Sequence, residues 1–335
     1  IQELQQVKGD AYDYYIAGNE DTDLFEKIFL VDDIVEEICK PDKYFLIGEK
    51  GSGKTAYSVY MSKSDKINSF CSISLVENTL YQRFLNMKRQ KALELSSFKD
   101  VWINLIYLIL AEKIRKEYGE TFFSSIKYKQ LSKAIDVFYS DAFKPEFVNA
   151  FEFVDNASAS INSMMKQGLF STGTKASAET SQKYVEQSFQ ISLLKIRDGF
   201  EKAFMSVNLK KPTILFVDGI DARPRDIDNE QYFECLVGLV NAVLEMNQSF
   251  LKEKQIKIML LIRPDIMYKM PVHNMNQKLR NNSVLLNWVT SYRKYIDSKL
   301  FKIADDYFMK QQDYSYELGE CWNYYFPYKV EYQEK

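Results

Sequence analysis

The chain has 335 residues, of which 46% are hydrophobic and 27% charged, the composition of an ordinary folded globular protein. Its net charge of −2 excludes a domain committed as a whole to nucleic acid, although a local basic groove is not excluded. Glycine and proline are scarce, at 12 and 7, beside 23 tyrosines and 23 phenylalanines. This balance favours a helix-rich, closely packed chain.

The four cysteines and the single histidine are spaced too widely to predict a zinc site or a disulfide framework (Cys39, Cys71, Cys235, Cys321, His273). We expect no signal peptide, since no such pattern is seen, and the apolar run WINLIYLILA is too short to span a bilayer. We therefore expect a cytoplasmic protein that does not enter membranes. A first residue other than Met suggests a piece of a longer protein.

The first elements expected are a helix and a strand. Residues 23–40 carry apolar side chains at roughly helical spacing, which predicts one helix with a solvated acidic face. The apolar run Tyr44–Ile47 then predicts a strand, and AYSVYMSK after Thr55 predicts the opening of a helix.

Between that strand and helix, Gly48 to Thr55 match G-x-x-x-x-G-K-[ST], the phosphate loop. Glycines let the loop wrap closely round an anion, and its amides with the helix N-terminus form a nest for phosphates. Lys54 would reach the β- and γ-phosphates, and the Thr55 hydroxyl would bind Mg²⁺. A chance glycine-rich turn is the alternative, and the complete motif in this context argues against it. The predicted nucleotide-binding residues are Gly48, Glu49, Lys50, Gly51, Ser52, Gly53, Lys54, Thr55 and Ala56.

A long segment of mainly helical pattern follows a predicted strand at 69–77. Helices are expected at 101–118, 124–143 and 184–206, with aromatic stripes that are more typical of a core than of a ligand site. Residues 154–183 are rich in Ser, Thr, Ala, Gln and Gly, which predicts a flexible or exposed insertion.

The second stretch with a chemical signature is PTILFVDGIDARP, residues 212–224. The apolar run Ile214–Val217 ends in Asp218, the Walker B pattern, in which a buried strand delivers a carboxylate to Mg²⁺ directly or through water. Asp221 is the candidate for polarising the attacking water. Alone, the run would be read as an ordinary strand and turn, but its pairing with the phosphate loop favours the functional reading.

The remaining pattern predicts a long helix at 230–254, strands at 256–265 and 283–288, a helix at 289–308 and an aromatic tail. Arg263, at the end of its strand, would either contact the γ-phosphate or pair with a carboxylate such as Asp265. Arg280 and Arg293 are candidate arginine fingers toward a neighbouring subunit, although surface arginines are the simpler interpretation.

The alternation of strands and helices predicts an α/β fold, a three-layer α/β/α P-loop NTPase with a mainly parallel sheet and a large helical insertion. We expect the chain to divide into a first part of the core at 1–78, the insertion at 79–205, a second part of the core at 206–300 and a C-terminal extension at 301–335.

With these motifs in view, the chain resembles bacterial P-loop ATPases near the KAP and STAND branches of the AAA-like ATPases. The resemblance rests on Gly48–Ala56, Ile214–Pro224 and Leu260–Asp265, and leaves most of 80–205 unmatched. It implies binding of ATP with Mg²⁺, an ATP-driven conformational or assembly change, and a place in multi-component systems, often defence against phage. One departure is Gly219, which stands where AAA-type Walker B motifs usually have an acidic residue. A sensor arginine in a C-terminal helical lid is also not found.

The leading hypothesis is an ATP-hydrolysing switch that regulates a partner or effector, with Lys54, Asp218, Asp221 and Arg263 as its catalytic residues and Thr55 and Asp218 on the metal. Homo-oligomerisation is expected. ATP is the default nucleotide because no N-K-x-D guanine motif is present.

Three alternatives stay open. ATP could lock an assembly with little hydrolysis, which Gly219 favours. A DNA-processing motor has weak support from the lysines of residues 127–133 with Lys166 and Lys175, and salt-dependent DNA binding would favour it. A small-molecule kinase lacks a recognisable acceptor base.

Overall fold

The protein is described by a computed structural model over residues 3–5, 8–16, 19–76, 98–123, 128–142, 193–220, 229–270, 279, 281–288 and 295–327. The predicted flexible stretch 154–183 lies outside these residues. So do Asp221, His273, Arg280 and Arg293.

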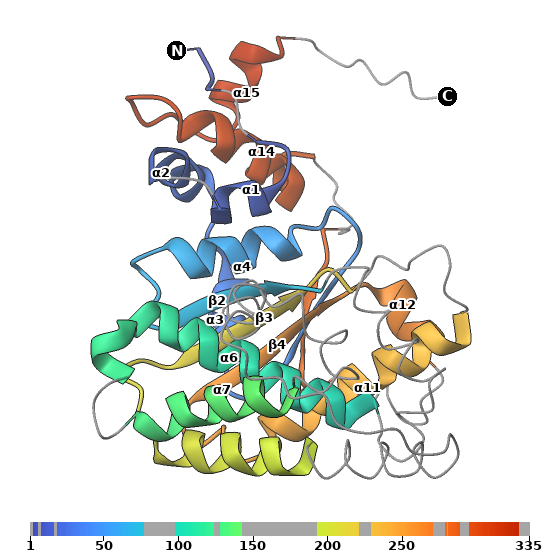
Figure 1. The fold of residues 1–335 in the computed structure, drawn as a ribbon. Coiled ribbons are helices and arrows are strands. Elements are labelled where there is room, and N and C mark those ends of the chain that lie inside the picture. The colour runs from blue at the N-terminus through green and yellow to red at the C-terminus, as the bar shows by residue number, and fades with distance from the viewer. Residues whose placement is uncertain are drawn as a thin grey trace.

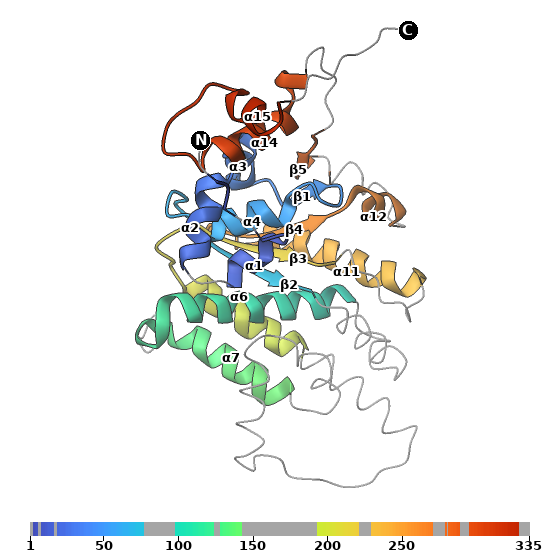
Figure 2. The same cartoon turned by 90° about the horizontal axis from the view of Figure 1, so that it is seen from above.

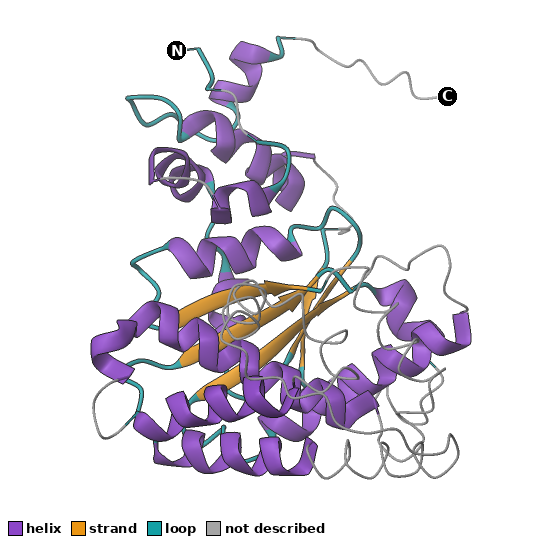
Figure 3. Ribbon diagram, viewed as in Figure 1, coloured by secondary structure: helices purple, strands orange, loops and turns teal. Residues whose placement is uncertain are grey.

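A five-stranded sheet forms the centre of the molecule, with strands in the order β2-β3-β4-β1-β5 and every neighbouring pair parallel (Figure 3). Phe45 of β1 is level with Leu260 of β4 and with Ser283 of β5. The predicted α/β class and the presence of all five predicted strands are confirmed, although the strand predicted at 256–265 ends at Ile262 because Pro264 begins a helix. The strands are β1 Phe45–Gly48, β2 Phe70–Leu75, β3 Thr213–Asp218, β4 Ile256–Ile262 and β5 Ser283–Leu286.

Helices cover both faces of this sheet (Figure 1). One face carries α1 Ala11–Ile16, α2 Asn19–Ile28, α3 Asp33–Cys39 and α4 Lys54–Lys63. The other carries α6 Phe98–Phe123, α7 Lys129–Ala142, the helical residues 193–206 and α11 Asn229–Asn247. The remaining elements are α12 Pro264–Lys269, the short 3₁₀ helix η1 Tyr295–Asp297, α14 Lys299–Met309 and α15 Glu320–Tyr325.

The strand order explains why α4 and α11 lie on opposite faces. From β1 the chain crosses through α4 to β2 at the far edge, whereas from β3 it returns through α11 toward β4. Crossovers between parallel strands are right-handed, so two that run in opposite directions leave their helices on opposite faces. The chain leaves β1 toward β2 but leaves the neighbouring strand β4 in the other direction, toward β5. Neighbouring parallel strands whose connections run in opposite directions open a crevice at their carboxyl ends.

Alternate residues of each central strand feed two separate hydrophobic cores. In β3, Leu215 and Val217 join the core on the α6 and α11 face, and Ile214 and Phe216 join the core on the α4 face. Period-two alternation with both faces apolar is the pattern of a strand covered on both sides. This double covering explains why the strand sequences read as nearly continuous apolar runs.

Helix α6 is buried on all sides over residues 101–112, which is the expected state of a helix that is apolar all round. It packs against α11, where the Trp102 indole donates to the Cys235 carbonyl at 3.1 Å. At the rim of this contact, Arg197 binds Glu201 at 2.8 Å and Glu245 at 2.7 Å. The predicted aromatic core is confirmed here, since Tyr107, Phe138, Phe200 and Phe204 are all buried.

Two predicted helices are wrong in extent. Residues 23–40 form two helices, because the Asp32 carboxylate caps α3 by accepting from the Ile34 amide at 3.2 Å. The helix predicted at 230–254 ends at Asn247, whose side chain instead bonds the Ile258 amide at 2.9 Å and the Ile258 carbonyl at 2.7 Å. These bonds turn the chain back into β4.

The predicted helix at 289–308 also begins late within the described residues. Helix α14 starts at Lys299, where the Ser298 hydroxyl accepts from the Phe301 amide at 2.9 Å. This part of the chain meets the N-terminal residues, because the Gln5 amide donates to the Gln311 side chain at 2.7 Å (Figure 2). Among the described helices, none combines the length and apolar character needed to cross a membrane.

Helices α11 and α6 pack so closely at Gly238 that adding a single methyl group there tests the contact. A Cβ on Gly238 would lie 2.6 Å from the Phe98 Cβ and 3.0 Å from the Lys99 amide nitrogen. We expect Gly238→Ala to lower the free energy of unfolding by about 1–3 kcal/mol, because overpacking forces the helices apart. Gly199 is helical with open space around it. We therefore expect Gly199→Ala to raise that free energy by about 0.5–1 kcal/mol. Urea unfolding of both variants measures the two changes in the free energy of unfolding. Equal changes would contradict the close packing of α11 on α6 at Gly238.

Candidate functional site

The loop between β1 and α4, residues 48–53, lies at the carboxyl end of β1, beside the carboxyl end of β4 (Figure 1). Its backbone needs glycine at two positions, because Gly51 has φ 79° and Gly53 has φ 88°. Gly53 is also the N-cap of α4. The loop therefore delivers its chain directly to the N-terminus of a ten-residue helix.

Gly48 is required for a different reason, which is close packing. A Cβ there would collide with the Ser52 side chain and lie 3.0 Å from the Leu286 Cβ. The loop is held from outside by the Trp288 indole, which donates to the Ser52 carbonyl at 2.8 Å. The buried Ser52 hydroxyl itself has no hydrogen-bond partner.

The Lys54 side chain is folded beneath this loop. Only 7% of the residue is exposed, and its ammonium donates to the Gly48 carbonyl at 2.8 Å and to the Glu49 carbonyl at 3.1 Å. A buried ammonium needs such partners, because burying an isolated charge is costly. These two hydrogen bonds hold the positive charge against the backbone of the loop.

Thr55 and Asp218, predicted to share a metal ion, are brought together by the structure. The Thr55 hydroxyl donates to one carboxylate oxygen of Asp218 at 2.6 Å, and the Gly219 amide donates to the other at 2.7 Å. Thr55 opens α4 after β1 and Asp218 ends β3, with β4 lying between the two strands. Residues 163 positions apart thus meet at the carboxyl ends of the strands.

Position 219 holds glycine, where the family that the chain resembles usually has an acidic residue, and the local backbone explains why. Its φ is 85°, a conformation that side chains rarely adopt. A Cβ would also lie 3.0 Å from the Val76 carbonyl oxygen, which follows β2. The Val76 amide donates to the Asp218 carbonyl at 2.7 Å and fixes this approach. No side chain fits at position 219 without rearrangement.

Arg263 takes the second of its two predicted roles in this structure. Its guanidinium makes a two-pronged contact with Asp265, with nitrogen–oxygen distances of 3.0 and 2.8 Å. It stands at the carboxyl end of β4, between β3 and β1, as the N-cap residue of α12. Asp221 lies just beyond the described residues; the adjacent Ile220 is held by the Tyr232 hydroxyl, which donates to its carbonyl at 2.8 Å.

Three residues near the site were missed by sequence reasoning. Trp288 was read only as part of a strand, yet it anchors the glycine loop. The Tyr57 hydroxyl of α4 donates to Asp32 at 2.9 Å and so ties the helix behind the loop to α3. Burial raises the pKa of Asp32, although this bond and the Ile34 amide act in the opposite direction. Only the aromatic residue types hinted at these contacts.

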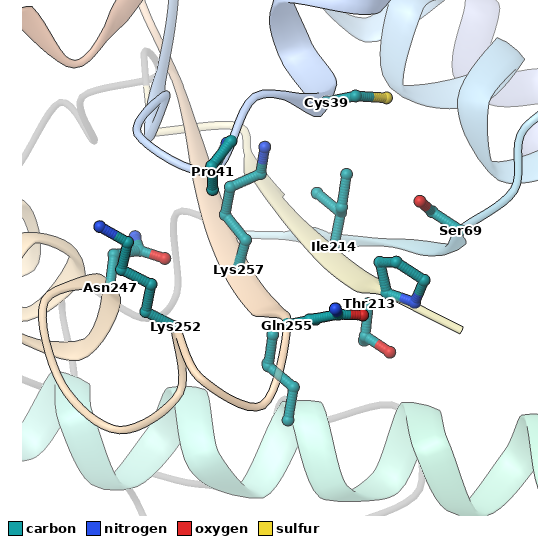
Figure 4. Close-up of a pocket in the computed structure, with 11 residues that line it drawn as sticks. Cys39, Pro41, Ser69, Thr213, Ile214, Asn247, Lys252, Gln255 and Lys257 are labelled. Carbon is teal, nitrogen blue, oxygen red and sulfur yellow. The ribbon is translucent and has the colours of Figure 1, made fainter. Parts of the chain in front are cut away.

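At the opposite, amino-terminal ends of β3 and β4 lies a cavity of about 230 Å³ (Figure 4). Lys257 lines it, 7% exposed, and its amine donates to the Ile38 carbonyl and to the Lys40 carbonyl at the end of α3. Burial lowers the pKa of Lys257 to about 8, with nearby thiols acting in the opposite direction. The lysine closes the C-terminus of a helix, where a cation is favoured.

The described residues contain no cluster of three or more His, Cys, Asp or Glu side chains that could hold a metal ion. All four cysteines lie in the described part of the chain and are free thiols.

Comparisons of the chain with protein-family models, with curated proteins and with solved structures returned no match.

The buried Lys257 predicts a dependence of stability on pH. Because its pKa falls from 10.5 unfolded to about 8 folded, the folded state binds fewer protons between these values and gains stability as pH rises. Relative to Lys257→Met, we expect the wild-type free energy of unfolding to rise by about 2 kcal/mol between pH 7.5 and 9.5. Urea unfolding at both pH values measures this difference. Lys302→Met, at an exposed position of α14, keeps Lys257 and is the control, so it should show the same rise with pH as the wild type. Equal pH dependence in all three proteins would contradict the assignment.

Proposed function

We propose that this protein is a P-loop ATPase of the three-layer α/β/α type, a Mg²⁺-dependent switch that binds and hydrolyses ATP. One observation carries the proposal: a glycine loop at the end of β1 presents Lys54 and Thr55 beside Asp218 at the end of β3. The three side chains supply a cation, a hydroxyl and a carboxylate. Phosphoryl transfer in P-loop NTPases uses these groups together with a loop that opens a helix.

The loop suits a phosphate chain for several independent reasons. Its glycines at positive φ let backbone amides face a bound anion, and the N-terminus of α4 adds favourable partial charge. Ser52 offers a buried hydroxyl that lacks a partner. The Lys54 ammonium, now on two carbonyls of the loop, would transfer its hydrogen bonds to phosphate oxygens.

Thr55 and Asp218 would hold the magnesium ion. Both offer oxygen atoms, the ligand type that Mg²⁺ prefers, and their 2.6 Å hydrogen bond shows that they converge on one point. Mg²⁺ usually keeps several waters and binds one or two carboxylates plus substrate phosphates, and Asp218 would supply one such carboxylate. When bound, it would neutralise charge on the transferred phosphoryl group. The Gly219 amide fixes the carboxylate in place.

The residue that activates water is the open part of this proposal. Asp221 is the nearest acidic residue along the chain after Asp218, and the Tyr232 contact to Ile220 restrains the backbone that leads to it. Arg263 would stabilise the γ-phosphate only by sharing or leaving Asp265. A binding-only variant, in which ATP locks an assembly without rapid turnover, is favoured by one observation: Gly219 has no space for an acidic side chain.

Connections from the site support a role as a switch. Val76 bonds Asp218 and leads into the segment between β2 and β3, while Tyr232 joins the loop after β3 to α11. Helix α11 in turn packs on α6. A change at Asp218 would thus reach the helices of residues 79–205, the proposed surface for a partner or effector. The family resemblance suggests a cytoplasmic, oligomeric component of bacterial defence against phage.

ATP turnover by the purified chain tests the enzymatic part. We expect Mg²⁺-dependent turnover that falls about 100-fold or more in Lys54→Ala, because a charge that binds the γ-phosphate is lost. Loss of turnover in Asp221→Ala with unchanged ATP binding would place that residue in the chemistry. Lys302→Ala, on α14, is the surface control.

Two outcomes would change the assignment. If wild type binds ATP but turns it over no faster than Lys54→Ala, the binding-only function replaces hydrolysis. If neither ATP binding nor turnover is detected in wild type, the proposed function is wrong.

A further inference from the structure

A groove of about 730 Å³ opens at the amino end of the edge strand β2. Its walls come from α1, the last turn of α4, the C-terminal half of α6 and the residues that precede β3. The strand ends here are opposite to those that carry the glycine loop (Figure 1). The groove is therefore separate from the proposed ATP site.

The charge of this groove contrasts with that of the whole chain. Five lysines line it, Lys63, Lys113, Lys116, Lys210 and Lys211, against the two carboxylates of Asp65 and Glu117. The side chains thus sum to +3, five minus two, on a protein of net charge −2. Lys116, Lys210 and Lys211 are exposed and pair with no acidic side chain among the described residues. Concentrated positive charge in a groove attracts polyanions.

Two of these lysines are held in place by an aromatic ring. The amines of Lys63 and Lys113 lie 5.6 and 6.0 Å from the centre of the Tyr15 ring. Cation–π contacts of this kind fix ammonium groups without neutralising them. The two ammonium groups are thus ordered on one wall of the groove.

The edge of β2 does not favour an added peptide strand. Amides of Phe70 and Val76 bond toward β3, so the Ile73 amide faces outward, where it donates to the Tyr15 hydroxyl at 3.3 Å. Main-chain pairing with an incoming peptide would need that amide. An acidic peptide is therefore a poorer occupant than a polyanion bound through its charges.

The floor and walls also offer groups suited to bases. Ser72 is 3% exposed, and its hydroxyl, which lines the groove, has no hydrogen-bond partner. Phe70 and Tyr118 line the same groove, with ring centres 6.1 Å apart and edge-on geometry. A basic groove with aromatic side chains is the usual means of binding single strands without sequence preference.

We propose that this groove binds single-stranded nucleic acid, with the lysines on the phosphates and the aromatic rings against the bases. Lysines are flexible point charges, unlike the forked guanidinium of arginine, so the binding would be insensitive to sequence. The proposal does not depend on ATP binding.

Fluorescence anisotropy of a labelled 12-nucleotide single strand, titrated with the full chain, tests it. Contacts to about five phosphates predict that the affinity falls about 100-fold between 50 and 200 mM salt. We expect the triple variant Lys116→Glu, Lys210→Glu, Lys211→Glu to weaken binding at least about tenfold and to reduce the salt dependence.

The matched control carries the same change of charge elsewhere, with Lys252→Glu, Lys269→Glu and Lys302→Glu at exposed positions. It should bind nearly as wild type does. Both triple variants change exposed side chains, and thermal unfolding checks that they fold. Equal loss in the two triple variants, tighter binding of a duplex, or full displacement of the strand by a polyglutamate peptide at equal charge would each overturn the proposal.

Discussion

The hydrogen bond between Thr55 and Asp218 joins the start of α4, the helix that follows β1, to the end of β3, and the remainder of the candidate site is arranged around it. It requires the parallel order in which β4 separates β1 from β3. That order in turn requires helices on both faces, and these bury the apolar strand residues in two cores. The glycine loop and Lys54 are positioned by the same strand ends.

Much of this arrangement could be predicted from local sequence. Apolar runs predicted four of the five strands, alternation of apolar with small residues predicted β2, and the glycine spacing identified the loop before Lys54. The breaks at Asp32 and Asn247 could not be predicted, because each depends on a side chain whose bonds compete with a continuing helix. The anchoring of the loop by Trp288 comes from a residue 236 positions away. Local patterns carry no information about such partners.

Lysines illustrate how position decides chemistry in this chain. Lys54 and Lys257 are equally buried, but Lys54 lies where a loop opens a helix and Lys257 where a helix ends. The first is available for an anion, whereas the second stabilises carbonyl oxygens. Exposed lysines such as Lys210 form a third class, whose charge attracts without being held. The net charge of −2 does not distinguish these three classes of lysine.

The most direct test of the central claim is calorimetric titration of the full chain with ATP, once with Mg²⁺ and once with excess EDTA. If Thr55 and Asp218 hold the ion that bridges protein and phosphates, ATP should bind with one site per chain, and at least about tenfold more tightly with Mg²⁺. Asp218→Ala should abolish the difference between the two conditions. Equal affinity with and without Mg²⁺ in the wild type, or no heat of binding at all, would contradict the account.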